Sequence, residues 1–166
     1  MKQPKALEYA YFLLKFRSLS EAAMKERLLW KGFAENEVEE TLAALRNQKL
    51  LNDSQLAEHL AESRLKNRLM GDARVQQELM QKGIDKNIAE KTVRDMAQSS
   101  EVPDEEERAY RLILKRRKQI KEIDSRTLFR RLYEHLARRG FSPDTIEHAL
   151  SRYRRGTHES DKIKQS

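Results

Sequence analysis

The segment Leu28–Phe33 reads LLWKGF, and its pattern, Leu-x-x-(Lys/Arg)-Gly-(Phe/Ile), occurs twice more in this chain of 166 residues. The second copy is Leu79–Ile84, LMQKGI, and the third is Leu136–Phe141, LARRGF. A glycine in the first position after a helix can adopt the left-handed backbone that ends the helix, and the apolar residue after it then folds back onto the Leu of the last turn. The pattern therefore predicts helix caps at Gly32, Gly83 and Gly140.

The three glycines are spaced by 51 and then 57 residues, a range that is typical of stacked structural repeats. Apolar residues recur 6, 10 and 13 positions after each glycine: Val38, Leu42 and Leu45, then Ala89, Val93 and Met96, then Ile146, Leu150 and Tyr153. Another apolar residue lies four positions before each motif Leu: Met24, Val75 and Leu132. Each copy thus has one helix into the glycine and one helix out of it. We predict an all-α fold, an elongated tandem array of three three-helix repeats that resemble helix-turn-helix units.

The boundaries of these repeats follow from helix starts and breaks. We expect repeat one at residues 1–52, with a first helix from about Pro4 to Phe16, and repeat two at residues 53–103, where Asp72 is placed to cap the helix into Gly83. Residues 98–103 form a polar run closed by proline and are the best candidate for a linker or hinge. Repeat three is expected at residues 104–155, followed by a disordered tail at 156–166.

The charge of the chain is +7, and most of it belongs to the third repeat. Residues 1–52 carry +2, residues 53–103 carry -1, residues 104–155 carry +6, and the tail is neutral. Such a field attracts polyanions or acidic protein surfaces. The chain has no cysteine, no apolar run long enough to span a bilayer and no signal-peptide pattern, so we expect a cytoplasmic protein.

No set of residues in the sequence has the spacing of a known catalytic or metal site. The four histidines share no ligand spacing, and no P-loop, G-x-S-x-G or G-x-G-x-x-G motif occurs. Acidic residues stand three and four positions from Lys and Arg on the predicted helices, as in solvated ion pairs. We therefore expect no enzymatic activity, no cofactor and no metal.

The best candidates for binding are basic residues on two predicted helices of the third repeat. On a helical wheel, four line one face of the helix that follows the acidic run at residues 104–107: Arg108, Arg111, Lys115 and Lys118. Four more stand among the apolar residues of the next helix, Arg130, Arg131, Arg138 and Arg139, and the first three of them are candidate contacts. Taken singly, each of these cations is more typical of a solvated face, whereas the cluster as a whole favours a contact surface.

The chain resembles the RecX family over about residues 6–153. The resemblance rests on the three glycine motifs, on the opening LNDSQLA at Leu51–Ala57, and on a basic segment that holds Arg64, Arg68, Gly71 and Arg74. The family usually has two acids where this chain has Asn52 and Asp53, and an aromatic residue in place of Leu56. These departures affect capping and packing more than binding.

The resemblance implies a regulatory function without catalysis. RecX-like proteins lie in the groove of the RecA recombinase filament on single-stranded DNA and modulate, mostly inhibit, its ATPase, strand-exchange and coprotease activities, in DNA repair, homologous recombination and the SOS response. It also implies that Arg64, Arg68 and Arg74 contact the partner, and we expect a monomer that can touch single- or double-stranded DNA directly. Two alternatives remain open from the residues: a DNA-binding regulator of the helix-turn-helix type, and a helical-repeat adaptor that binds only protein.

Overall fold

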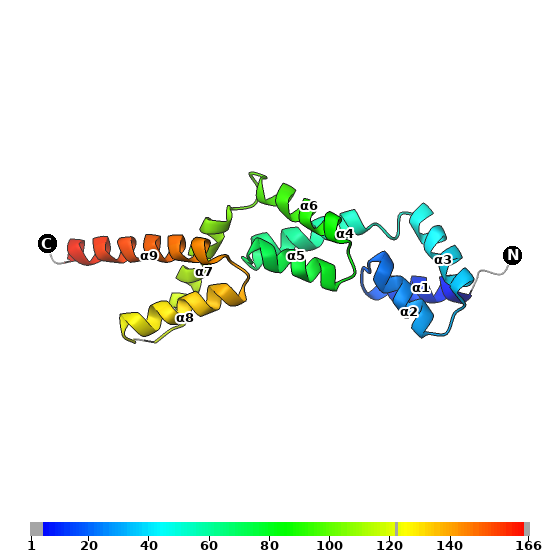
Figure 1. Ribbon diagram of the computed structural model, residues 1–166, viewed down its shortest axis with the longest axis horizontal. Coiled ribbons are helices and arrows are strands. Elements are labelled where there is room, and N and C mark those ends of the chain that lie inside the picture. The colour runs from blue at the N-terminus through cyan, green and yellow to red at the C-terminus, as the bar shows by residue number, and fades with distance from the viewer. Residues whose placement is uncertain (1–4, 122, 165–166) are drawn as a thin grey trace. The chain divides into compact units, whose positions relative to one another are not determined.

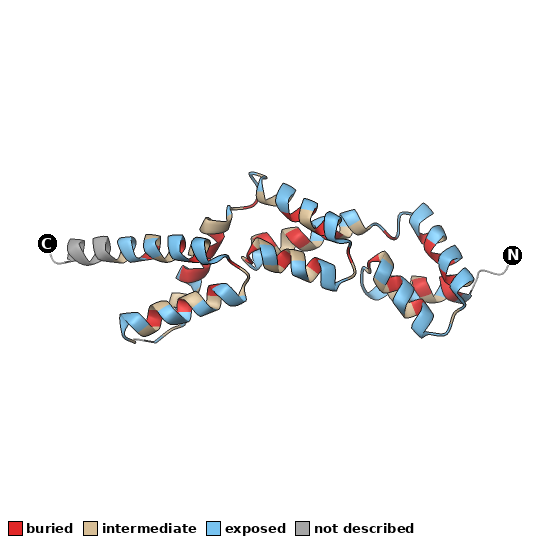
Figure 2. Ribbon diagram, in the orientation of Figure 1, coloured by how far each residue is buried: buried red, intermediate tan, exposed pale blue. Residues whose placement is uncertain are grey.

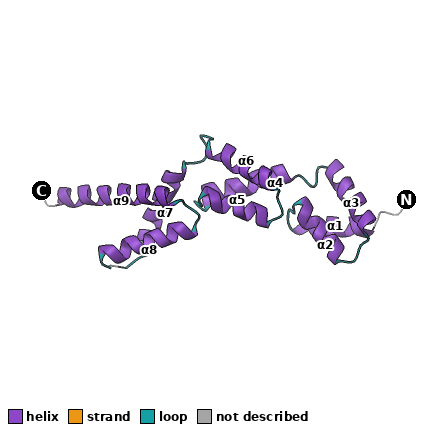
Figure 3. Ribbon diagram, viewed as in Figure 1, coloured by secondary structure: helices purple, strands orange, loops and turns teal. Residues whose placement is uncertain are grey.

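The computed structural model describes residues 5–121 and 123–164, with side chains described as far as residue 157. Within these ranges the regular elements are all helical (Figure 1 and Figure 3), as predicted for a tandem array of helical repeats. Pro4, the predicted start of the first helix, lies outside them. The α-helices are α1 (Lys5–Phe16), α2 (Glu21–Trp30), α3 (Glu35–Asn47), α4 (Asp53–Glu62), α5 (Asp72–Gln81), α6 (Lys86–Ala97), α7 (Glu105–Arg117), α8 (Ser125–Arg138) and α9 (Pro143–Lys164), with a π-helical turn at Ser63–Asn67 after α4.

The contacts between residues divide the chain into two units. Unit 1 comprises residues 1–60 and 77–92, and unit 2 comprises residues 61–76 and 93–166. The division into three repeats with boundaries at residues 52, 103 and 155 stays a prediction.

The core of unit 1 lies where α1, α2 and α3 pack together. Figure 2 shows buried residues along one side of each of these helices. Met24 and Leu28 stand four residues apart on α2, which places both side chains on one face of the helix. The buried residues of this cluster are Ala6, Leu7, Ala10, Met24, Leu28, Val38, Leu42, Leu45 and Leu51.

The core of unit 2 lies where α7, α8 and α9 pack together. Of the apolar positions that share a register with those of α3, Ile146 and Tyr153 are buried and Leu150 is partly buried, because the same helical period turns them to one side. The buried residues of this cluster are Ala109, Leu112, Ile113, Leu128, Leu132, Leu136, Phe141, Ile146, Ala149 and Tyr153.

The three motif glycines have positive φ angles of 94°, 83° and 83° at Gly32, Gly83 and Gly140. At each site two backbone hydrogen bonds close the helix. In the first bond, the amide of the residue after glycine donates to the carbonyl of the motif Leu, over 3.2, 3.2 and 3.4 Å in the three copies. In the second, the glycine amide donates to the carbonyl of the residue that follows the motif Leu, over 2.9, 2.9 and 3.0 Å. This pair of bonds defines a Schellman cap.

The predicted disordered tail differs from what the structure contains. Helix α9 begins at Pro143 and continues to Lys164, through most of residues 156–166. Gly156 is the one glycine within this helix, and a single glycine costs only about 1 kcal/mol inside a helix. The lack of an apolar pattern in the tail therefore did not exclude helix.

Candidate interaction surfaces

Unit 1 contains a junction between helices that belong to successive copies of the motif. The hydroxyl of Ser20, which caps α2 by accepting from the amide of Ala23, donates to the carbonyl of Lys82 over 2.5 Å. The amide of Glu21 donates to a carboxylate oxygen of Asp53, the first residue of α4, over 2.9 Å. The turn after α5 and the start of α4 are thus both fixed to the start of α2.

Unit 2 contains a second junction built from the same two contacts. The amide of Gly71 donates to the carbonyl of Arg139 over 2.9 Å, and the amide of Asp72 donates to a carboxylate oxygen of Glu105, the first residue of α7, over 3.0 Å. Gly71 lies twelve residues before Gly83, as Ser20 lies twelve residues before Gly32. The repeat in sequence therefore extends to the contacts that join one motif copy to the next.

The helix α8 cannot offer a third junction of this kind. Its N-cap is Asp124, whose carboxylate accepts from the amide of Thr127 over 2.9 Å, and this cap lies sixteen residues before Gly140. The residue twelve positions before Gly140 is Leu128, which is buried within the helix. Helix α8 has one more turn at its N-terminal end, so the amide of Leu128 already donates to the carbonyl of Asp124, over 3.0 Å, within the first turn of the helix.

Arg108 is not the surface contact that the helical wheel predicts, because its side chain is fully buried in unit 2. Its guanidinium group forms an ion pair with Asp72 and donates to the carbonyls of Met70, over 3.2 Å, and Pro103, over 2.8 Å. Asp72, the first residue of α5, therefore holds the Arg108 side chain in place. Burial raises the pKa of Asp72 above its ordinary value, against the effect of Arg108, which lowers it. Arg108 must be removed from the set of predicted partner contacts.

The other three cations predicted on α7 are exposed. Arg111 remains 54% exposed although its Nε lies 2.7 Å from a carboxylate oxygen of Glu107, and Lys115 and Lys118 are also open to solvent. These residues are four and three positions apart, so they share one side of the helix. They form the exposed cation row of α7: Arg111, Lys115 and Lys118.

The three cations predicted on α8 are exposed as well: Arg130, Arg131 and Arg138. The positive field in this part of unit 2 acts on a neighbouring histidine. Burial lowers the pKa of His135, and the charges of Arg116, Arg139 and Arg138 lower it further. The imidazole is thus kept neutral where guanidinium groups gather.

The residues taken from the family resemblance lie on the second motif copy and differ in exposure. Arg68 is exposed, whereas Arg64 and Arg74 are partly buried. The carbonyl of Arg68 accepts from Arg139 over 2.9 Å, and the β-carbon of Arg74 lies against Gly140. At Arg68 and Arg74 the structure therefore shows contacts within unit 2, while their part in binding stays a prediction.

The sequence analysis did not single out three further arginines of unit 2: Arg139, Arg152 and Arg154. Arg152 pairs with Glu107 over 2.8 Å and stacks 3.9 Å from the centre of the Tyr110 ring, and Arg154 lies 4.7 Å from the centre of the Phe129 ring. Arg154 also borders a cavity of about 320 Å³ with Phe129 and Arg130. Arg139 could have been predicted from its position directly before Gly140, because Lys82 stands in the same position before Gly83.

Two family models match this chain. Residues 52–93 match the second three-helix domain of RecX, and residues 104–150 match the third three-helix domain of RecX. Regulatory protein RecX of Amycolatopsis mediterranei is 31% identical over 137 residues, which cover 82% of this chain and 76% of that protein. This chain belongs to the RecX family. The resemblance found in the sequence is thereby confirmed.

Other RecX proteins are similar over comparable lengths. The regulatory protein RecX of Pasteurella multocida is 31% identical over 86% of this chain and 84% of that protein, and the one of Clostridioides difficile is 29% identical over 89% and 68%. The crystal structure of RecX from Lactobacillus salivarius has the same fold, with a TM-score of 0.74 at 22% identity over 89% of this chain and 94% of that chain.

None of the helices in the described part of the chain has the length and apolar character needed to cross a membrane. Nor do residues 5–121 and 123–157, whose side chains are described, bring three or more His, Asp or Glu side chains together in a group that could hold a metal ion.

Proposed function

We propose that this chain binds the RecA recombinase filament on single-stranded DNA and inhibits its ATPase, strand-exchange and coprotease activities. The observation that carries this proposal is that a member of the RecX family carries its whole net charge of +7 on unit 2, where the exposed cations of α7 and α8 lie. A nucleoprotein filament is a periodic assembly with a high negative charge, which a basic surface recognises over a distance of several ångströms.

The repeated junctions support a binding mode with several contacts. Two junctions of the same construction present the motif copies in succession, and each copy can make one weak contact with a filament whose protomers are also repeated. Linked weak contacts add through effective concentration, so the affinity of the chain for a filament would exceed that of any single copy.

The experiment that tests this proposal is the rate of ATP hydrolysis by the cognate recombinase on single-stranded DNA, with this protein added well below the concentration of recombinase and of DNA sites. At such a ratio, competition for DNA cannot lower the rate, so a marked loss of ATPase activity places the protein on the filament. An unchanged rate up to equimolar protein contradicts the proposal. Specific retention of a DNA duplex in a gel would then favour the helix-turn-helix alternative.

A further inference from the structure

A pocket of about 760 Å³ opens in unit 1 between the start of α2, the end of α4 and the turn after α5. Its lining includes five large apolar side chains: Leu19, Trp30, Leu56, Leu60 and Met80. Trp30 is 85% exposed and is the only tryptophan of the chain. Large aromatic side chains left open to solvent beside a pocket are typical of binding sites, and this volume is within the usual range of ligand pockets.

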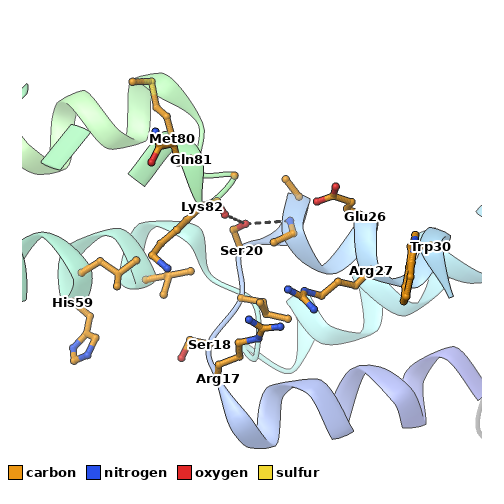
Figure 4. A pocket seen from close by; sticks show the side chains of 16 residues that line it. Arg17, Ser18, Ser20, Glu26, Arg27, Trp30, His59, Met80, Gln81 and Lys82 are labelled. Carbon is orange, nitrogen blue, oxygen red and sulfur yellow. Dashed lines mark hydrogen bonds between the residues drawn. The ribbon is translucent and has the colours of Figure 1, made fainter. Parts of the chain in front are cut away.

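The lining of this pocket also holds positively charged side chains. Arg17, Arg27 and Lys82 line the pocket, and Figure 4 shows the guanidinium groups of Arg17 and Arg27 directed toward the same part of it. Among the described residues, no carboxylate forms an ion pair with any of these three cations, and Glu26 is the one acid in the lining. An unpaired guanidinium group next to apolar surface favours a carboxylate or a phosphate.

The charge of unit 1 distinguishes between these two anions. A nucleic acid strand needs cations along its whole path, but unit 1 has 12 basic and 12 acidic residues and no net charge. A peptide needs only local charge together with apolar contact. Unit 1 supplies this contact, since it holds six of the seven large apolar side chains that are exposed in the described part of the chain: Phe12, Phe16, Leu29, Trp30, Leu50 and Met80.

We infer that this pocket binds a peptide segment of a protein partner in which carboxylates flank a bulky apolar side chain. The apolar side chain enters between Leu56, Leu60 and Met80, the carboxylates accept from Arg17 and Arg27, and Trp30 covers the bound segment from the rim. Trp and Arg at the edge of an apolar pocket are the residue types that carry most of the binding energy in protein interfaces.

The inference deepens the proposed function, on which it rests for the identity of the partner: it assigns contact with the protein part of the filament to unit 1. Peptide binding is nevertheless measured without recombinase. A failure here leaves the ATPase result standing, and a failure of the ATPase experiment leaves peptide binding standing.

The test uses the full chain and the fluorescence of Trp30, with three probes. The first is a short peptide of Asp and Glu with one Leu and one Phe, the second has Ser in place of both apolar residues, and the third is oligothymidylate of similar charge. We expect the first peptide alone to change the Trp30 emission in a saturable way. Replacing Arg17 or Arg27 by Gln should weaken this binding about tenfold, the loss of one charge-assisted hydrogen bond.

Lys15→Gln is the matched control, because Lys15 is an exposed cation of unit 1 that does not line the pocket. It should bind the first peptide as tightly as the natural chain does. An equal response to oligothymidylate, in competition with the peptide, would assign the pocket to nucleic acid. A peptide response that neither arginine substitution weakens, an equal response to the Ser peptide, or no response to any probe would each overturn the inference.

Discussion

Unit 1 has 12 basic and 12 acidic residues, whereas unit 2 has 22 basic and 15 acidic residues and so carries the entire net charge of +7. The exposed apolar side chains are distributed in the opposite way, with Leu114 as the one large example in the described part of unit 2. Both units nevertheless contain the same glycine caps and the same junction contacts. A repeat of this type constrains its caps and buried positions and leaves its surface free to differ.

The two units also use ion pairs differently, and this gives the largest expected effect. In unit 2, Arg108 is buried with Asp72, whereas in unit 1 the pair of Lys25 and Glu39, 2.5 Å apart, is about half exposed on both sides. Arg108→Ala should lower the free energy of unfolding by about 3–5 kcal/mol, because it leaves a carboxylate and two carbonyls without their partner in a buried site. Urea denaturation measures this loss.

Lys25→Ala is the control from unit 1 and should leave the urea midpoint unchanged, since exposed ion pairs contribute little to stability. If Arg108→Ala costs no more than Lys25→Ala, the buried pair is not what joins α7 to the loop before α5.

The second effect concerns the binding of the filament. Reversal of the exposed cation row of α7, by Arg111→Glu, Lys115→Glu and Lys118→Glu together, should weaken binding to the recombinase filament by about 100-fold at low salt and flatten its salt dependence. The same reversal in unit 1, at Lys15, Lys25 and Lys31, should have a smaller effect on both quantities. Binding titrations at several salt concentrations check this, and equal losses from the two triple variants would remove the distinction between the units.

The burial of Arg108 is a feature of the fold that could not be predicted from the sequence. The glycine motifs and their registers were local patterns, so they predicted the helix ends and the buried positions of α3 and α9. A helical wheel also placed Arg108 correctly beside Arg111, but it cannot tell which neighbour covers a face of the helix. Here the segment from Met70 to Asp72, about 36 residues earlier in the chain, covers it.

The pocket of unit 1 could not be predicted from the sequence either. Its lining comes from three separate stretches around Ser20, Leu60 and Lys82, and no local pattern joins them. Trp30 gave no signal either, because a tryptophan on an amphipathic helix is usually a core residue. The motif repeat did contain one usable sign: Trp30 stands two residues before Gly32, and the equivalent residues near Gly83 and Gly140 are polar.

The third effect is the loss of stability when the cap glycines are replaced by alanine, which should differ between the two units. A β-carbon on Gly32 would meet no atom within 4 Å, whereas one on Gly140 would lie 2.3 Å from the β-carbon and 2.8 Å from the backbone nitrogen of Arg74. Gly32→Ala should therefore cost only the left-handed backbone strain of about 1 kcal/mol. Gly140→Ala should cost about 2–3 kcal/mol, because the overpacking adds to this strain.

Gly83→Ala should fall between these two, since its β-carbon would meet the Ser20 hydroxyl at 2.8 Å. Thermal denaturation followed by circular dichroism ranks the three variants. An equal loss at Gly32 and Gly140 would mean that the junction in unit 2 can open without cost.

The smallest effect is a dependence of stability on pH that differs between the units. Hydrogen bonds from Arg111, and then from Arg152, hold the pKa of Glu107 below its ordinary value of 4.5. A lowered pKa in the folded state means that the stabilisation is present above pH 4.5 and is lost as the pH falls through the folded value. Glu107→Gln should therefore lower the free energy of unfolding by about 0.5–1 kcal/mol at pH 7, and this loss should shrink as the pH falls below 4.5. Glu39→Gln in unit 1 removes a carboxylate whose pKa is also lowered, by Lys25, but whose side chain is about half exposed, so its effect at pH 7 should be smaller. Urea titrations of both variants at pH 7 and near pH 3 decide between these outcomes, and a loss for Glu107→Gln that persists at low pH would show that packing, not charge, fixes this side chain between α7 and α9.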